Sequence, residues 1–191
     1  MNWRPDPKEA QELLHKRLSD EKRWGAQSSY DDSWDARAEM AATFMRQSRC
    51  VLDLGAGKMG LRRYLEPGCD YQPADLAPLV SNALRIDLNT DPVPTGRWDT
   101  VSMLGVMEYL FSPQEVLVKI RAATNHLVFS YGVMTHNVSS VKQWRRDHGF
   151  ATNLNEEELR SMISSSSFRI EEEKIFAELW GLKVIIFDCK A

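Results

Sequence analysis

The sequence contains few cysteines and no long apolar run, and each absence excludes a class of protein. Its 191 residues include three cysteines, Cys50, Cys69 and Cys189, and no C-x-x-C pair. An odd number of cysteines without that spacing predicts reduced thiols, and neither a disulfide framework nor a zinc site. No apolar stretch approaches the roughly 18 residues of a membrane-spanning helix, and the charged first residues lack the apolar core of a signal peptide. We therefore expect a cytoplasmic protein that binds neither a metal nor a membrane.

The chain also lacks a surplus of positive charge. Its formal net charge is −3, and 43% of its residues are hydrophobic. Proteins that grip a nucleic acid backbone usually carry a basic surplus or stripe, so a DNA or large RNA partner is disfavoured. The composition is that of an ordinary globular protein. The length suits one domain with a full sheet and helices on both of its faces.

The most informative stretch covers residues 49–60, R-C-V-L-D-L-G-A-G-K-M-G. A short apolar run ends near Asp53, and a glycine-rich turn with Gly55, Ala56 and Gly57 follows it. This order predicts a strand, a tight turn and the start of a helix. In an open α/β sheet, such a turn holds an adenosyl or dinucleotide cofactor. The spacing G-x-G-x-x-G does not by itself separate these two cofactors.

Asp53 favours one of them. A glycine turn at a helix N-terminus receives the pyrophosphate of a dinucleotide. A carboxylate beside it would repel that group by about 1 kcal/mol or more if partly desolvated. S-adenosyl-L-methionine has no phosphate and carries an ammonium and a sulfonium group, so an acidic neighbour stabilises it. The D-x-G-x-G of Asp53, Gly55 and Gly57 resembles the first motif of the class I, Rossmann-like S-adenosylmethionine-dependent methyltransferases.

Further acidic residues follow at the ends of predicted strands. A second strand over 71–76 ends at Asp75, with Leu76 beside it, and a third strand is expected over 83–89 after a shortened crossover. A carboxylate about 20 residues after the glycine turn accepts hydrogen bonds from the ribose hydroxyls in Rossmann-type sites. Asp75 therefore supports an adenosine cofactor of either kind.

The resemblance implies further contacts with the cofactor, from Asp87, Leu88, Leu104, Gly105 and Glu108. Asp87 and Leu88 match the positions that meet the adenine amine and the adenine face, with a loop cap by Asp87 as the alternative. A buried strand within residues 98–110 would bring main-chain groups of Leu104 and Gly105 to the methionine end. Glu108 follows where this segment meets the substrate pocket.

The segment before the first strand is rich in aromatic residues. Helices are expected over 7–23 and 33–47, with a polar, aromatic loop between them. In small methyltransferases this segment often covers the cofactor and the substrate, which assigns Tyr30, Trp34 and Arg37 to the site. A guanidinium fork matches the methionine carboxylate in a bidentate manner, so Arg37 is its candidate partner. The alternative is that the rings only pin the helices to the core.

Candidate catalytic residues lie in the last third of the chain. Tyr131 ends the fifth predicted strand, where ligands gather outside parallel strands. His136 and His148 accompany Trp144 and Arg145 in a cluster that suits an aromatic or anionic small molecule, although an ordinary surface helix is the alternative. If the nucleophile is a hydroxyl, one of the two histidines would take its proton. Tyr131 or Glu108 would then orient the reacting groups.

The closing strands, 168–176 and 182–188, are joined by a short connection, which requires an antiparallel pair. The expected fold is an α/β, Rossmann-like, seven-stranded, mostly parallel sheet with the last strand antiparallel, helices on both faces and an N-terminal helical extension. One domain is expected over 1–191. It divides into a helical cap (1–48), a cofactor-binding half (49–132) and the substrate-side helices with the closing hairpin (133–191).

The sequence thus predicts a methyltransferase that uses S-adenosyl-L-methionine on a small-molecule acceptor and releases S-adenosyl-L-homocysteine. The motif N-P-P-[YF] of many enzymes that methylate adenine or glutamine is absent, which tells against those acceptors. An NAD-dependent oxidoreductase and a non-catalytic, cofactor-binding scaffold are the alternatives. The sequence leaves the methylated atom and the oligomeric state open.

Overall fold

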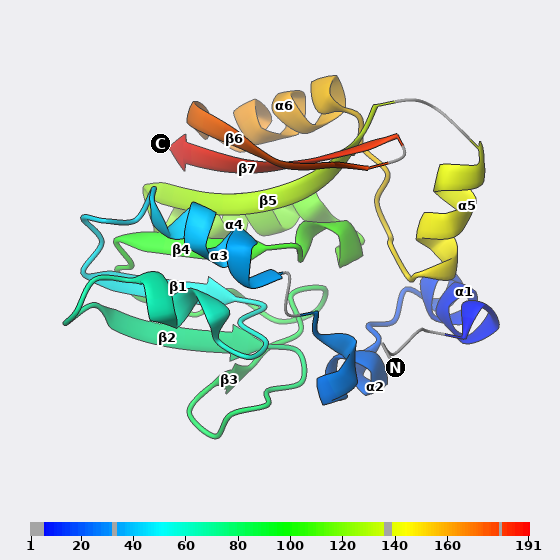
Figure 1. The fold of residues 1–191 in the computed structure, drawn as a ribbon, viewed down its shortest axis with the longest axis horizontal. Helices are drawn as coiled ribbons and strands as arrows, with labels where there is room; N and C mark the ends of the chain where they lie inside the picture. Colours follow the sequence, from blue (N-terminus) through cyan, green and yellow to red (C-terminus); the bar gives the residue numbers. More distant parts are fainter. Residues whose placement is uncertain (1–5, 32–33, 136–138, 180) are drawn as a thin grey trace.

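The computed structural model describes residues 6–31, 34–135, 139–179 and 181–191. Its centre is a seven-stranded sheet with the order β3-β2-β1-β4-β5-β7-β6 (Figure 1). The strands are β1 (Cys50–Leu54), β2 (Asp70–Asp75), β3 (Leu84–Arg85), β4 (Thr100–Leu104), β5 (His126–Met134), β6 (Arg169–Leu179) and β7 (Leu182–Lys190). Neighbours among β1 to β5 pair in parallel, whereas β7 is antiparallel to β5 and to β6. The predicted mostly parallel sheet with an antiparallel last strand is confirmed.

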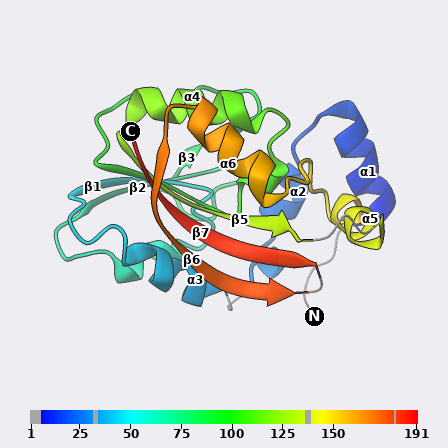
Figure 2. The same cartoon turned by 90° about the horizontal axis from the view of Figure 1, so that it is seen from above.

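Helices cover both faces of this sheet, as expected for parallel strands with apolar side chains on both sides. The α-helices are α1 (Pro7–Lys16), α2 (Glu21–Trp24), α3 (Trp34–Ala42), α4 (Pro113–Ala123), α5 (Ser139–Asp147) and α6 (Glu156–Ser165). Short 3₁₀ helices are η1 (Gln27–Ser29), η2 (Gly60–Tyr64) and η3 (Met107–Tyr109). Figure 2 shows α4 and α6 on one face and α3 on the other.

Two apolar clusters hold these layers together. The cluster between the sheet and α3 includes Ala41, Met45, Leu61, Val128 and Ile186. The cluster under α4 and α6 includes Leu117, Ile120, Phe129, Leu159, Ile163 and Phe187. In β5, which lies between β4 and β7, all nine residues are buried. The core therefore fixes the middle of the sheet, and the connecting loops begin at the strand ends.

The N-terminal helix predicted over 7–23 is wrong in one respect, because the chain forms two separate helices. α1 ends at Lys16, and Arg17 adopts a left-handed conformation with φ 53°. The N–H of Arg17 then bonds back to the carbonyl groups of Leu13 and Leu14, which closes the helix. The side chain of Asp20 accepts from the N–H of Arg23 and starts α2. α1 lies beside α5, beyond the carboxyl ends of the central strands (Figure 1).

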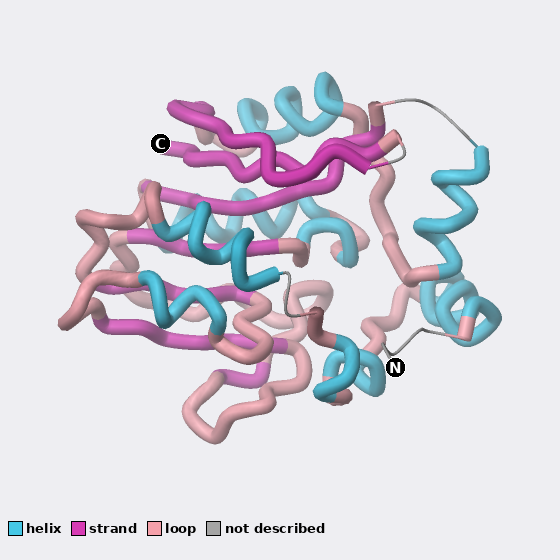
Figure 3. Tube along the Cα trace, in the orientation of Figure 1, coloured by secondary structure: helices cyan, strands magenta, loops and turns pink. Residues whose placement is uncertain are grey.

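Three further segments are shorter than predicted. The helix expected over 33–47 is α3, which ends at Ala42. The helix expected after the glycine turn is the five-residue 3₁₀ helix η2. The strand expected over 83–89 contains only Leu84 and Arg85. It stops because the N–H of Asp87 bonds to the side chain of Asp91 at 2.8 Å, which turns the chain away from β2. The shortened crossover is confirmed, since a loop without a helix joins β2 to β3 (Figure 3).

The described part of the chain contains neither a membrane-spanning helix nor a cluster of metal ligands. None of its helices has both the length and the apolar character needed to cross a bilayer. The described histidine, cysteine, aspartate and glutamate side chains form no group of three or more that could hold a metal ion.

Candidate functional site

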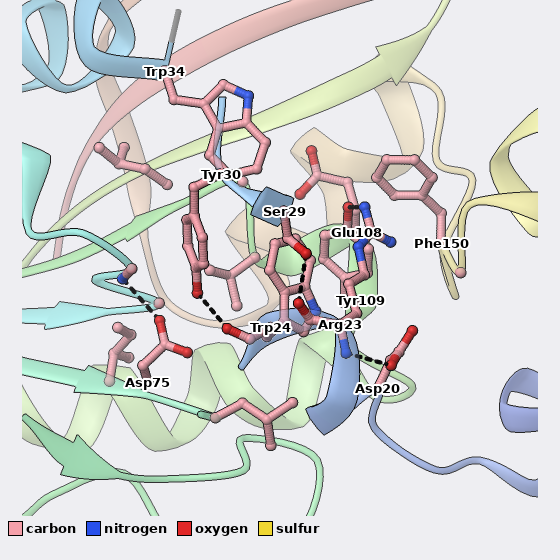
Figure 4. Close-up of a pocket in the computed structure, with 18 of the residues that line it drawn as sticks. Asp20, Arg23, Trp24, Ser29, Tyr30, Trp34, Asp75, Glu108, Tyr109 and Phe150 are labelled. Atoms are coloured by element: carbon pink, nitrogen blue, oxygen red, sulfur yellow. Dashed lines mark hydrogen bonds between the residues drawn. The ribbon is translucent and has the colours of Figure 1, made fainter. Parts of the chain in front are cut away.

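A cavity of about 840 Å³ opens at the carboxyl ends of the parallel strands. The glycine turn after β1, the end of β2, the segment after β3 and the end of β4 all contribute to its lining. The N-terminal segment of residues 6–31, here named the cover, and the loop 148–150 after α5 also line it. Figure 4 shows Tyr30 and Asp75 on one side of the cavity and Glu108, Tyr109 and Phe150 on the other. Ligands of open α/β sheets bind in this place.

The glycine turn has a backbone geometry that residues with a side chain rarely adopt. Gly55 and Gly57 have φ values of +79° and +51°. A Cβ on Gly57 would lie 2.4 Å from Cε1 of Tyr30, so the ring of Tyr30 packs directly on the turn. The N–H of Gly57 donates to Oδ2 of Asp75 at 2.8 Å, and the N–H of Ala56 donates to the carbonyl of Ala74 at 3.1 Å. The predicted residues of the turn therefore lie together at the cavity, locked to the end of β2.

Asp53 lies in β1 immediately before the turn, and its side chain is only 3% exposed although it lines the cavity. The hydroxyl of Tyr71, from the adjacent strand β2, donates to Oδ2 at 2.5 Å. Burial raises the pKa of Asp53 to about 6, and the hydrogen bond from Tyr71 opposes this increase. An ionised carboxylate buried in this position costs free energy, and a cationic group of a ligand would reduce this cost.

Arg37 extends from α3 to the end of β4. Its Nη2 donates to the carbonyl of Leu104 at 3.4 Å, and a Cβ on Gly105 would lie 2.5 Å from Nη1. The guanidinium also lies over the ring of Trp34, 5.4 Å from its centroid. Its Nε is shielded from solvent and has no hydrogen-bond partner among the described residues. Removal from water lowers the pKa of Arg37, and the carboxylate of Glu108 opposes this effect.

The remaining cofactor candidates lie around the same cavity. Tyr30 donates its hydroxyl to the carbonyl of Trp24 at 2.9 Å and meets Trp34 edge to face, with centroids 5.9 Å apart. The aromatic residues of the cover therefore pack on each other and line the cavity at the same time. Leu76, Asp87 and Leu88 also belong to the lining.

Asp87 caps its own loop, as the alternative interpretation proposed. Its Oδ1 accepts from the N–H of Asn89 at 2.9 Å and from the hydroxyl of Ser19 at 2.8 Å. The second of these bonds ties the cover to the loop after β3. Since Asp87 still lines the cavity, a loop cap and a contact with a ligand do not exclude each other.

The candidate catalytic residues are not all brought to the cavity. His136 lies outside the described residues. Tyr131 is fully buried and is not part of the lining. Its hydroxyl donates to Oγ1 of Thr152 at 3.1 Å and accepts from the N–H of Leu154 at 3.0 Å. Tyr131 thus fastens the loop after α5 to the end of β5 and does not face a ligand.

His148 does line the cavity. Its ring stacks on Trp144 with centroids 4.2 Å apart, and its Nδ1 lies 2.7 Å from the carbonyl oxygen of Trp144. A carbonyl only accepts, so Nδ1 carries the proton of the neutral ring. The free lone pair is then on Nε2, so Nε2 is the atom that can accept a proton.

Arg23, Trp24 and Phe150 are among the lining residues that were not predicted from the sequence. Arg23 is 9% exposed, and its Nη1 donates to the carbonyl of His148 at 2.5 Å. Its guanidinium also lies 4.4 Å from the centroid of the Trp24 ring. Phe150 stacks on Tyr109 with centroids 4.8 Å apart. The aromatic content of the cover could have identified Trp24. No sequence pattern could have revealed that Arg23 pairs with residues far along the chain.

No protein-family model matches the chain, and no curated protein matches its sequence. Several solved structures do match. The mitomycin 7-O-methyltransferase MmcR is 15% identical with a TM-score of 0.66, and the match covers 95% of this chain and 60% of that one. A SAM-dependent methyltransferase from Archaeoglobus fulgidus is 16% identical with a TM-score of 0.67, over 90% of this chain and 97% of that one.

A third match is the 1,6-didemethyltoxoflavin-N1-methyltransferase of Burkholderia thailandensis, solved with 1,6-didemethyltoxoflavin and S-adenosylhomocysteine bound. It is 17% identical with a TM-score of 0.61, over 83% of this chain and 79% of that one. The chain spans about 60% of the length of MmcR. At these identities the likeness shows the fold, which is the class I, Rossmann-like methyltransferase fold predicted from the sequence.

The burial of Asp53 predicts a pH-dependent cost to stability. Its folded-state pKa is about 6, above the ordinary 3.8, so the folded protein binds this proton more tightly than the unfolded chain. Stability therefore falls as the pH rises through this window, by up to about 3 kcal/mol. In urea unfolding without ligand, we expect Asp53→Asn to be more stable than the wild type at about pH 7.5, with a smaller difference near pH 4. Asp70→Asn, at the exposed start of β2, is the control. An equal difference at both pH values would contradict the assignment.

The hydrogen bond of His148 predicts its tautomer. In long-range ¹H–¹⁵N NMR spectra at a pH where the ring is neutral, Nδ1 should show the protonated and Nε2 the unprotonated type of ¹⁵N shift. Trp144→Ala removes the stacked ring and keeps the main-chain carbonyl, so the tautomer should persist in this variant. A proton on Nε2 in the wild type would show that the bond to the carbonyl does not form.

Proposed function

We propose that the protein is an S-adenosyl-L-methionine-dependent methyltransferase that acts on a small-molecule acceptor. The observation that carries the proposal is the pair of buried carboxylates, Asp53 and Asp75, on either side of the glycine turn. Asp53 is 3% and Asp75 7% exposed. A ligand with a positively charged end and free ribose hydroxyls fits these groups, and a pyrophosphate does not.

The shape of the turn supports the same choice. Dinucleotides place their pyrophosphate at the N-terminus of the helix that follows a glycine turn, where aligned peptide dipoles favour negative charge. Here the turn leads into the five-residue 3₁₀ helix η2. So short an element offers little dipole and few free N–H groups. An NAD-dependent oxidoreductase is therefore the weaker proposal.

Residues at the cavity can be assigned to the separate chemical groups of the cofactor, beginning with its methionine end. Arg37, whose Nε has no partner among the described residues, is assigned to the methionine carboxylate, and Asp53 to the ammonium. Main-chain groups of Leu104 and Gly105 adjoin this end. Tyr30 and Trp34 cover the bound molecule from the side of the cover.

The other end of the cofactor is assigned to the strand ends beyond β1. Asp75 and Leu76 are assigned to the ribose, and Asp87 and Leu88 to the adenine, all from the cavity lining. This order along the cavity follows the order of the strands β1, β2 and β3 in the sheet.

When bound, the cofactor supplies a methyl group activated by a sulfonium. The protein binds the two partners, aligns them and excludes water, which converts a bimolecular reaction into an intramolecular one. For a hydroxyl acceptor, Nε2 of His148 is the assigned proton acceptor. Glu108 is the assigned orienting group, and Tyr131 holds the loop that carries one wall of the cavity.

Ligand-induced stabilisation tests the choice of cofactor. We expect S-adenosyl-L-homocysteine at about 100 times its Kd to stabilise the protein by about 2.7 kcal/mol, which raises Tm by roughly 5–10 °C. NAD and NADH at the same concentration should leave Tm unchanged. Stabilisation by NAD(H) and not by S-adenosyl-L-homocysteine would refute the methyltransferase assignment.

The two ends of β2 provide a matched pair of variants. Asp75→Asn keeps an oxygen that can accept from the N–H of Gly57 but loses the charge offered to the ribose hydroxyls. We expect calorimetric titration to show about 10- to 100-fold weaker binding of S-adenosyl-L-homocysteine, since hydrogen bonds to a charged group contribute about 1.5–3 kcal/mol. Asp70→Asn, at the exposed start of the same strand, should bind as the wild type does. Equal affinities of the two variants would remove Asp75 from the site.

A further inference from the structure

A row of aromatic rings forms the wall of the cavity opposite the glycine turn. Tyr109 stacks on Phe150 at 4.8 Å and 22°, Phe150 meets Trp144 at 5.8 Å and 31°, and Trp144 stacks on His148 at 4.2 Å and 28°. These four residues, here named the ring row, all line the cavity. Because neighbouring rings lie face to face, they cover each other's faces, and the row presents ring edges to the cavity. A flat aromatic molecule can lie across these edges in the edge-to-face arrangement that aromatic pairs favour.

Glu108 lies next to this wall, because it precedes Tyr109 in η3. Its side chain is 7% exposed and belongs to the cavity lining. Oε1 accepts from the N–H of Gly132 at 2.9 Å. This bond forms because β4 ends at Leu104 whereas β5 continues to Met134, so that the protruding part of β5 has no neighbouring strand on this side.

The second oxygen of Glu108 has no such partner. Oε2 is shielded from solvent and receives no hydrogen bond from any described residue. The guanidinium groups of Arg37 and Arg145 lie nearby and balance its charge, but neither donates to Oε2, and the Nε of each has no partner among the described residues. Arg37 donates to the carbonyl of Leu104, and Arg145 donates to those of Gly132 and Thr152. A buried carboxylate oxygen without a donor costs about 1–3 kcal/mol or more. The deficit is one hydrogen-bond donor, and not one positive charge.

We propose that the acceptor is a planar aromatic molecule that lies against the ring row and donates an N–H or O–H to Oε2 of Glu108. The inference rests on the proposed function, because it names the substrate class of the same site. Both features are needed together. The ring row selects for a flat apolar body, and Glu108 selects, within that class, for a molecule with a donor at its edge. Glu108 is therefore a specificity-determining residue.

Glu108→Gln tests this proposal by exchanging the acceptor for a donor. The N–H of Gly132 needs an acceptor, so the amide oxygen of glutamine takes the place of Oε1. The amide NH₂ is then left at the position of Oε2. The preference of the site should therefore invert, and the fold should remain intact because the bond to Gly132 is kept.

The probes are two matched pairs, 1-naphthol with 1-methoxynaphthalene and indole with N-methylindole, and trans-2-decalol as a non-planar alcohol. Binding is measured by ligand-observed NMR with S-adenosyl-L-homocysteine present. We expect the wild type to bind 1-naphthol and indole about tenfold more tightly than their methylated counterparts, and not to bind trans-2-decalol. In Glu108→Gln, 1-methoxynaphthalene should bind at least as tightly as 1-naphthol. Glu157→Gln, on the exposed face of α6, should retain the wild-type order.

S-adenosyl-L-homocysteine is also titrated into the wild type and into each variant. This titration tests the proposed function independently of the acceptor class. If S-adenosyl-L-homocysteine binds to none of them, the proposed function fails. If it binds to all of them with similar affinity, the following results overturn the inference about the acceptor: no aromatic probe binds, trans-2-decalol competes equally, or 1-naphthol keeps its wild-type advantage over 1-methoxynaphthalene in Glu108→Gln.

Discussion

The hydrogen bond from the N–H of Gly57 to Oδ2 of Asp75 is the interaction on which the rest of the cavity depends. It joins the turn after β1 to the end of β2, and it forms only because Gly57 adopts a positive φ that brings its N–H toward the neighbouring strand. The missing Cβ of Gly57 also leaves room for the ring of Tyr30. One bond thus sets the floor of the cavity and the position of the cover above it.

The charges around the cavity follow a simple arrangement. Asp53 and Asp75 lie beside the glycine turn, and Arg23 and Arg145 lie at the opposite wall. Arg37 and Glu108 stand between the two groups. The two guanidinium groups at the far wall hold main-chain carbonyls, since Arg23 binds that of His148 and Arg145 those of Gly132 and Thr152. They fix the backbone of this wall, while the acidic side of the cavity stays available to a cationic ligand.

The sequence predicted what depends on local pattern. The turn with Gly55 and Gly57, the carboxylates at the ends of β1 and β2, and the closing hairpin could all be read from spacing and residue type. The extents of the first helix and of β3 could not. The left-handed backbone of Arg17 closes α1 before Asp20 starts α2, and the side chain of Asp91 takes the N–H of Asp87 and ends β3. Local capping of this kind competes with continuation of a helix or strand. The spacing of apolar residues in the sequence does not reveal which of the two forms.

The wall opposite the turn was the least predictable part, for a different reason. It unites the cover with residues more than a hundred positions later, as in the bond from Arg23 to His148. Tyr131 was predicted at the end of the fifth strand, but β5 continues to Met134, and the buried side chain of Tyr131 binds the loop through Leu154 and Thr152. Strand ends identify a region, but only the packing decides which side chain faces the ligand.

The cover touches both halves of the cavity at once, and this has a kinetic consequence. Ser19 binds Asp87 on the side of the glycine turn, and Gln11 binds Asp147 of α5 on the other side at 2.6 Å. A segment anchored at both ends opens as a unit. We therefore expect entry and exit of a ligand at the cavity to require movement of the cover as one unit.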